Sequence, residues 1–139
     1  MIIDIFYLKN VIEKLRNPEL LNSVALSKKF KGVLRPYQQK GVNWLCFLDS
    51  IQFGALLADD MGLGKTVQLL AFLDILAANK KNPASLLVLP ASLISNWVNE
   101  IHRFSPELKY FIAHPSFNND AVSMNKNFIE RYDLVITTY

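Results

Sequence analysis

Residues 58–68 read A-D-D-M-G-L-G-K-T-V-Q, and this stretch decides how the chain is interpreted. Its Gly-rich turn and Gly-Lys-Thr tripeptide stand between two apolar runs, residues 54–58 and residues 66–78. The first run predicts a short buried strand, and the second predicts a helix too apolar to lie on an open surface. A strand, a Gly-rich loop and a helix in this order form a phosphate cradle, because the loop N–H groups and the positive end of the helix dipole both face an anion.

The two residues after the loop, Lys65 and Thr66, have the chemistry that a nucleoside triphosphate needs. The ammonium reaches the β- and γ-phosphates, and the hydroxyl binds Mg²⁺. The alternative, a Gly-rich turn with a solvated lysine, explains neither residue. For Lys65 it also leaves a cation at a helix N-terminus, which is unfavourable by roughly 0.3–1 kcal/mol, a conflict that a bound polyphosphate removes. Asp59 stands where the common pattern, G-x-x-x-x-G-K-[ST], has its first glycine. Asp59 and Asp60 either order the loop, or meet Mg²⁺ through water, or are plain acids favoured near a helix N-terminus.

The composition indicates one globular domain, with 139 residues of which 51% are hydrophobic and 19% charged. The single cysteine, Cys46, excludes an intramolecular disulfide, and the two histidines have no carboxylate cluster beside them, so we expect no metal site built on them. No apolar run reaches the roughly 18 residues of a membrane span, and the first ten residues lack the features of a signal peptide. We therefore expect an intracellular protein with no membrane partner, in a bacterial cytoplasm or a nucleus.

Positive charge gathers in the N-terminal part of the chain. Residues 1–40 hold eight Lys/Arg and three Asp/Glu, and residues 41–139 hold seven and nine, which gives +5 and −2 within a formal net charge of +3. A basic run can bind phosphates of a nucleic acid, but such a run is more often a solvated face.

The rest of the chain alternates helical and strand patterns. Strands that alternate with helices form a parallel sheet with helices on both faces, so we expect a three-layer α/β fold. Ligands of such sheets bind at the carboxyl ends of the strands, so the loop at 59–64, the turn at 90–92 and the end at 137–139 are expected to meet at one edge. The expected helices cover residues 6–21 (interrupted at 17–18), a segment that starts at Pro36, 66–78, 91–104 and 122–131, with a loop at 115–120, and the expected strands cover 54–58, 85–89, 108–113 and 133–137.

Four segments together resemble the motifs of the SWI/SNF family of superfamily 2 helicase-like ATPases. They are L-R-P-Y-Q-Q-K-G-V-N-W-L (34–45) for the Q motif, residues 58–68 for motif I, L-V-L-P-A-S-L-I-S-N-W-V-N-E-I (87–101) for motif Ia, and D-L-V-I-T-T-Y (133–139) for motif Ib. The resemblance implies that residues 33–139 are part of the first RecA-like ATP-binding lobe, preceded by an N-terminal helix and basic connector, residues 1–32. Asp60 stands where the family usually has Glu, which keeps the charge.

The resemblance implies a role for each matching residue. Gln38 would read the adenine edge, because a primary amide offers a donor and an acceptor side by side, although the same segment could be an ordinary helix start. Ser92 would contact the DNA backbone through its hydroxyl, or would only cap its own helix. Thr137 and Thr138 match the backbone-contacting residues of motif Ib. The implied nucleotide-binding set is Arg35, Tyr37, Gln38, Asp60, Met61, Gly62, Leu63, Gly64, Lys65, Thr66 and Val67, with Lys65 and Thr66 catalytic and Thr66 on Mg²⁺.

The family resemblance implies an ATP-driven translocase on double-stranded DNA that binds ATP and Mg²⁺ and contacts the DNA backbone rather than its bases. A nucleosome or another DNA-bound protein is a compatible partner. Two alternatives stay open, namely another nucleic-acid-dependent ATPase, such as an RNA helicase or a restriction-type motor, and a nucleotide-binding regulatory module without motor activity. Motif II, the acidic pair that binds Mg²⁺, and the second lobe do not occur in these 139 residues. We expect the chain alone to be catalytically inactive and to self-associate through an unpaired strand edge.

Overall fold

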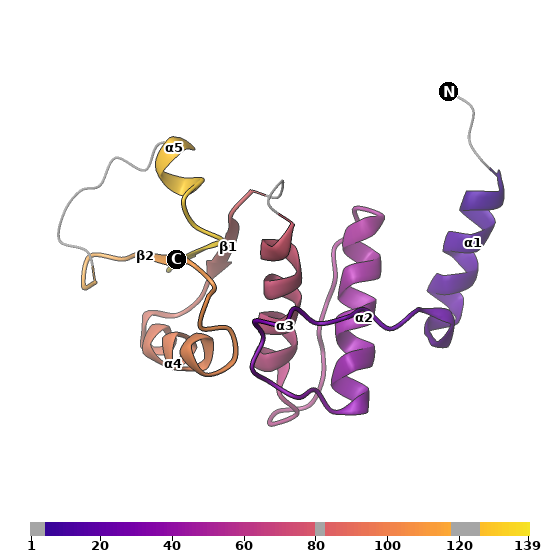
Figure 1. Ribbon diagram of the computed structural model, residues 1–139, viewed down its shortest axis with the longest axis horizontal. Coiled ribbons are helices and arrows are strands. Elements are labelled where there is room, and N and C mark those ends of the chain that lie inside the picture. The colour runs from indigo at the N-terminus through magenta and orange to yellow at the C-terminus, as the bar shows by residue number, and fades with distance from the viewer. Residues whose placement is uncertain (1–4, 80–82, 118–125) are drawn as a thin grey trace.

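The computed structural model describes residues 5–79, 83–117 and 126–139. Figure 1 shows α1 at one end of the molecule, α2 and α3 in the middle, and the strands and α4 at the other end. The elements, in chain order, are α1 (Ile5–Arg16), the 3-10 turn η1 (Pro18–Leu20), α2 (Pro36–Ser50), α3 (Lys65–Ala78), β1 (Ser85–Val88), the 3-10 turn η2 (Ala91–Leu93), α4 (Ile94–Phe104), β2 (Tyr110–Ala113), α5 (Lys126–Ile129) and β3 (Leu134–Thr137).

The sheet is parallel, and its strand order is β1-β3-β2. β3, the last strand in the chain, lies between the other two, with Leu87 of β1 and Ile112 of β2 both in register with Ile136. Parallel neighbours require crossover connections, and α4 is the helix between β1 and β2. The predicted parallel α/β architecture is therefore confirmed.

Helices pack on both faces of the sheet, although the second face is left open at β1, where Leu86 is 66% exposed. Leu134 and Ile136 of β3 are fully buried, and they share one hydrophobic core with Leu70 of α3 and Ile94 and Ile101 of α4. Because side chains alternate along a strand, Val135 and its register partner Phe111 face the other side. There the ring of Phe111 meets the ring of Phe128 in α5 edge-to-face, with centroids 5.0 Å apart. The three layers expected from the sequence are present.

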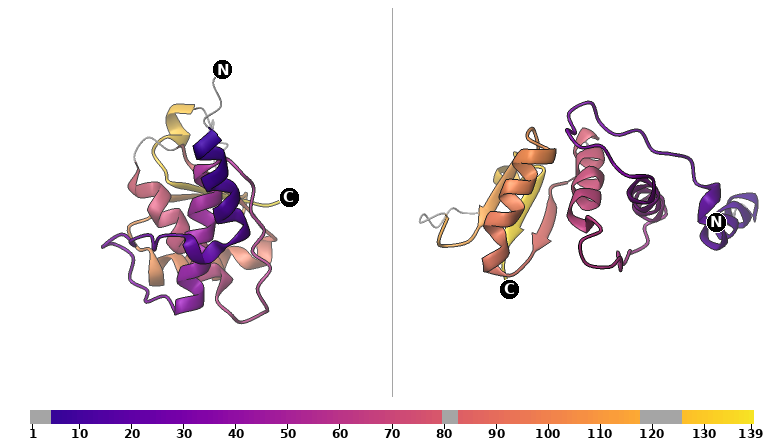
Figure 2. Two further views of the ribbon diagram at one scale, coloured as in Figure 1. Left: turned by 90° about the vertical axis from the view of Figure 1, so that its right-hand side faces the viewer. Right: turned by 90° about the horizontal axis from the view of Figure 1, so that it is seen from below.

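The N-terminal part divides into a projecting helix and a docked connector. No residue of α1 is buried, and Phe6 is 86% exposed. In Figures 1 and 2, α1 lies beyond α2 at the far end from the sheet. The connector, in contrast, packs on α4, because Phe30 stacks on Phe104 with ring centroids 6.3 Å apart and the Lys31 N–H donates to the Phe104 carbonyl at 2.7 Å. The boundary after residue 32 stays a prediction, although Phe30 belongs to the core.

The strand predicted over residues 54–58 is wrong. This segment is not part of the sheet, and Leu56 is 86% exposed. A strand needs a neighbouring strand to pair with its N–H and C=O groups. Within the described residues, β1 pairs only with β3, and no strand is paired with residues 54–58. An apolar run alone does not supply that neighbour.

Other boundaries shift by a few residues. The strand predicted over residues 108–113 begins at Tyr110, because the Leu108 N–H donates to the Ser105 carbonyl in a turn at 3.0 Å. Of the helix predicted over residues 122–131, the structure has Lys126–Ile129 as α5, and residues 122–125 lie outside the described residues, as do 118–120 of the predicted loop. In the described ranges, no helix is long and apolar enough to span a membrane.

Candidate nucleotide-binding site

The loop at residues 59–64 turns tightly through two glycines. Gly62 and Gly64 have φ angles of +85° and +78°, a region that favours residues without a Cβ. A Cβ on Gly64 would lie 2.5 Å from the Nε2 atom of Gln38, whereas a Cβ on Gly62 would meet none of the described atoms within 4 Å. The loop therefore closes against α2 at Gly64 and is open at Gly62.

Lys65, the first residue of α3, folds its side chain back onto the loop. Its ammonium donates to the carbonyl oxygens of Asp59 at 2.6 Å and Asp60 at 2.9 Å. These two oxygens compensate the cation at the helix N-terminus, an arrangement that the helix-dipole argument did not anticipate. Thr66 follows at the second helical position and is half-buried.

Two side chains at the start of α2 hold the loop from the other side. The Gln38 Nε2 and Tyr37 hydroxyl groups both donate to the Leu63 carbonyl, at 3.0 and 3.1 Å. The Gln38 Oε1 accepts from the Arg35 N–H at 2.9 Å. Since an amide has two N–H groups and two lone-pair sites, Gln38 keeps one donor and one acceptor for another partner. The structure thus brings the Q-motif residues against the loop, and the contact of Gln38 with adenine stays a prediction.

The remaining residues of the predicted set differ in exposure. Asp60 and Met61 are exposed at the tip of the loop, and Met61 is 97% exposed. Val67 packs against the hydrophobic core, so it supports the loop from below. In the described ranges, no group of three or more His, Cys, Asp or Glu side chains is placed to hold a metal ion.

Gln68 and Asp59 form a contact that sequence reasoning missed. Gln68 is fully buried, and its Nε2 donates to the Asp59 Oδ2 at 2.8 Å. The sequence assigned no role to Gln68 and left Asp59 undecided. The sequence did contain a signal, because an acid replaces the first loop glycine and an amide stands in the first turn of a mostly apolar helix.

Two of the three features expected at one sheet edge do lie together. The Leu89 N–H donates to the Thr137 carbonyl at 3.0 Å, so the turn at 90–92 and the end of β3 are neighbours. The third feature, the phosphate loop, follows residues 54–58, which lie outside the sheet, so strand pairing does not place the loop at this edge.

The Thr137 hydroxyl donates to the Ala113 carbonyl at 3.1 Å, which occupies its only proton. Ser92 is exposed and lies inside η2, and the N-cap positions of η2 and α4 are Pro90 and Leu93, so Ser92 is not the N-cap of either helix. Thr138 is half-buried just after β3.

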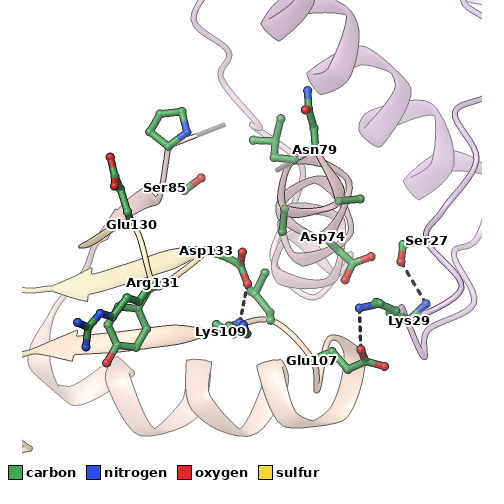
Figure 3. Close-up of a pocket in the computed structure, with 16 residues that line it drawn as sticks. Ser27, Lys29, Asp74, Asn79, Ser85, Glu107, Lys109, Glu130, Arg131 and Asp133 are labelled. Carbon is green, nitrogen blue, oxygen red and sulfur yellow. Dashed lines mark hydrogen bonds and ion pairs between the residues drawn. The ribbon is translucent and has the colours of Figure 1, made fainter. Parts of the chain in front are cut away.

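A separate polar cavity of about 390 Å³ lies at the opposite end of α3 (Figure 3). In it the Lys29 ammonium pairs with the Glu107 carboxylate at 2.8 Å, and the Lys109 N–H donates to the Asp133 Oδ2 at 2.8 Å. Burial raises the pKa of the Asp74 carboxyl, against the lowering effects of the Ser27 hydroxyl and the Lys29 charge. Since Asp74 follows Lys65 by nine residues, or roughly 13 Å of helix, this cavity is not part of the phosphate-loop site.

These features define a class of protein. A parallel sheet with helices on both faces, a glycine loop before an apolar helix, a lysine at the first position of that helix and an amide from a second helix on the loop together describe the nucleotide-binding lobe of a RecA-like ATPase. A family model described as the SNF2-related domain matches residues 37–139. The chain therefore belongs to the SNF2-related family, and it corresponds to the N-terminal region of a SWI/SNF-type superfamily 2 ATPase.

Relatives and solved structures agree with this membership. The chain is 39% identical over 133 residues to YwqA of Bacillus subtilis, provisionally named an ATP-dependent helicase/translocase, with 95% of this chain and 14% of YwqA covered. It is 41% identical over 110 residues to the ISWI chromatin-remodeling complex ATPase ISW1 of Saccharomyces cerevisiae, with 78% and 10% covered. It superimposes with a TM-score of 0.70 and 37% identity on the Sulfolobus solfataricus SWI2/SNF2 ATPase core in complex with dsDNA, covering 85% of this chain and 24% of that core. The chain thus spans a minor part of each of these proteins.

Proposed function

We propose that this chain is the ATP-binding part of the first lobe of a DNA-dependent ATPase that translocates on double-stranded DNA. Lys65 binds the β- and γ-phosphates, the loop N–H groups of residues 62–66 bind phosphate oxygens, and the Thr66 hydroxyl binds Mg²⁺. Gln38 recognises the adenine edge with its remaining donor and acceptor, bordered by Arg35 and Tyr37. Mg²⁺ neutralises phosphate charge when the nucleotide is bound.

The observation that carries the proposal is the position of the Lys65 ammonium. It donates to the loop carbonyls of Asp59 and Asp60. In the same loop, Gly62 leaves open space, because a Cβ there would meet none of the described atoms within 4 Å. A polyphosphate placed over the loop would exchange two neutral carbonyl partners of the ammonium for anionic oxygens, which form stronger hydrogen bonds. The residues present therefore fit a nucleoside triphosphate with Mg²⁺.

The DNA-binding part of the proposal concerns the edge made by the turn at 90–92 and the end of β3. Ser92 is exposed in the turn after β1, and Thr138 directly follows β3, the strand that pairs with β1. Thr137 joins them only if its hydroxyl leaves the Ala113 carbonyl. Support comes from the Sulfolobus core, whose structure is described as a complex with dsDNA. Backbone contacts of this kind are independent of base sequence and weaken with salt.

The test is the ATPase rate of the full-length protein with duplex DNA, single-stranded DNA, RNA or no nucleic acid. The Lys65→Ala variant removes the phosphate contact. Lys126→Ala is the matched control, since Lys126 is an exposed lysine with a 3.9 Å surface pair to Glu130. We expect stimulation by duplex DNA that Lys65→Ala abolishes and Lys126→Ala keeps.

The other outcomes each favour a different function. Stronger stimulation by RNA or single strands indicates another nucleic-acid-dependent motor. ATP binding without stimulation by any nucleic acid overturns the motor function and favours a regulatory module. Since ISW1 is named a chromatin-remodeling ATPase and YwqA is bacterial, the proposed compartment is a nucleus or a bacterial cytoplasm, and the DNA target is either a nucleosome or other DNA-bound protein or bare DNA.

We also propose that the 139-residue chain does not turn over ATP by itself. Phosphoryl transfer needs charge stabilisation on both sides of the γ-phosphate, and these residues contain neither motif II nor a second lobe. Phosphate release from the purified chain should equal that of its Lys65→Ala variant. Steady turnover above the variant would contradict this.

Self-association of the chain is expected along the outer edge of β1. In the described part of the chain this edge has no neighbouring strand, and Leu86 and Val88 on β1 are 66% and 51% exposed. Unpaired apolar edges pair with other chains. Sedimentation over a range of concentrations should show dimers or larger species, and a monomer at every concentration would contradict the proposal.

A further inference from the structure

The phosphate loop carries an acid where the common pattern has a glycine, and the structure shows where that acid is held. The Asp59 Oδ2 accepts a hydrogen bond of 2.8 Å from the Nε2 of Gln68, the fourth residue of α3. The Asp59 main-chain carbonyl accepts the Lys65 ammonium at 2.6 Å. Asp59 therefore links the buried Gln68 amide of α3 to the Lys65 ammonium, the group proposed to bind the phosphates.

The other end of the Gln68 amide lies against α2. Its Oε1 atom is buried and has no hydrogen-bond partner among the described residues. A Cβ on Gly41 would lie 2.0 Å from this oxygen and 3.2 Å from the Cδ of Gln68. The amide orientation follows from the contacts, because the reverse orientation would place an oxygen against the Asp59 carboxylate. Gln68 thus keeps an unpaired oxygen inside the protein in order to donate to Asp59, and α2 has room for it only with glycine at position 41.

We propose that Gln68 is a positioning residue for the phosphate loop, which holds the Asp59 carboxylate inward and so keeps an anion away from the bound triphosphate, with Gly41 providing the space. The inference rests on the proposed function, ATP binding at this loop. It explains why an acid is tolerated at position 59, since a released carboxylate would repel the phosphates, most strongly the terminal one.

The test compares nucleotide affinity in the full-length protein for wild type, Gln68→Leu, Asp59→Gly and the double variant. KM and kcat for ATP are measured together with the Kd of a fluorescent ADP analogue. We expect Gln68→Leu to raise KM for ATP about tenfold, with a smaller effect on ADP and an unchanged kcat. The double variant should return to within about threefold of Asp59→Gly, because no carboxylate is left to hold.

A merely structural role for Gln68 predicts a different pattern. It would lower the melting temperature and weaken ATP and ADP binding equally, and Asp59→Gly would not rescue it. Gln39→Leu is the matched control for losing a helical amide, since the Gln39 amide donates to the Val24 carbonyl and to Asn43 rather than to the loop. An unchanged KM in Gln68→Leu, or a double variant as weak as Gln68→Leu, overturns the proposal.

Gly41→Ala provides a second test from α2. Its methyl group occupies the place of the Gln68 oxygen, so we expect the same selective loss of ATP affinity even if Gln68→Leu fails to fold. An ATP affinity unaffected by Gly41→Ala contradicts the proposal. The proposed function fails separately, because in that case wild type and Lys65→Ala bind ATP equally poorly.

Discussion

The side-chain nitrogen of Gln38 donates to the main-chain carbonyl of Leu63 at 3.0 Å, across 25 positions of sequence. The Tyr37 hydroxyl shares the same acceptor. Both donors come from the first turn of α2, so the helix assigned to the base and the loop assigned to the phosphates form one hydrogen-bonded unit. A change in the loop conformation must therefore change the surroundings of the Gln38 amide.

Gly64→Ala should disrupt this unit. The new Cβ would lie 2.5 Å from the Gln38 Nε2. The alanine would also have to adopt the backbone φ of +78°, which costs about 1–2 kcal/mol. We expect a loss of stability of about that size and at least a tenfold loss of ATP affinity, measured by thermal unfolding and nucleotide titration. Gly54→Ala is the matched control, because a Cβ there meets none of the described atoms within 4 Å, and it should leave both values unchanged.

Ile101→Ala should destabilise the lobe. Ile101 is fully buried between α4 and the sheet, so its truncation leaves a cavity and should cost about 2–5 kcal/mol. Urea unfolding measures the loss. Val33→Ala serves as the control, because Val33 is exposed and surface changes stay within about 0.5 kcal/mol. A loss for Ile101→Ala similar to that of the control would place α4 off the sheet.

Asp74→Asn should stabilise the protein at neutral pH. Burial raises the pKa of this carboxyl above its ordinary value of 3.8. The folded state therefore holds the proton to higher pH than the unfolded state, so stability falls as pH rises through the folded pKa. Asparagine has no proton to lose and still accepts from Ser27. Melting temperatures should favour the variant at pH 7.5 and converge with wild type near pH 3, and a variant less stable at pH 7.5 would contradict this.

The Cys46 thiol should react slowly with alkylating reagents. Burial, with a smaller contribution from the Asp49 charge, raises its pKa from 9.0 to about 11. Two pKa units reduce the thiolate fraction roughly a hundredfold at pH 8, and the thiolate is the reactive form. Iodoacetamide labelling followed by mass spectrometry should be slow in the folded protein and fast in denaturant. Equal rates would show that the thiol is not shielded by the hydrophobic core on which Cys46 packs.

Local patterns predicted the helices well. The Pro36 start of α2 follows from the fixed φ of proline, and the end of α1 before Pro18 follows from the same residue type. The strand over residues 54–58 was predicted from a run of apolar residues alone. A helix satisfies its own backbone, whereas a strand depends on neighbours far along the chain, and this is why the one prediction held and the other did not.

The site divides in the same way. The sequence by itself determined the residue types of the loop, the order of the elements and, through four motifs, the family, because these depend on side-chain chemistry and short spacings. Only the tertiary structure decided that Gln38 holds Leu63, that Gln68 holds Asp59 against Gly41, and that the Thr137 hydroxyl is already bound to Ala113. These contacts join groups on different elements, and a buried amide or hydroxyl takes whichever partner the packing brings within hydrogen-bond distance.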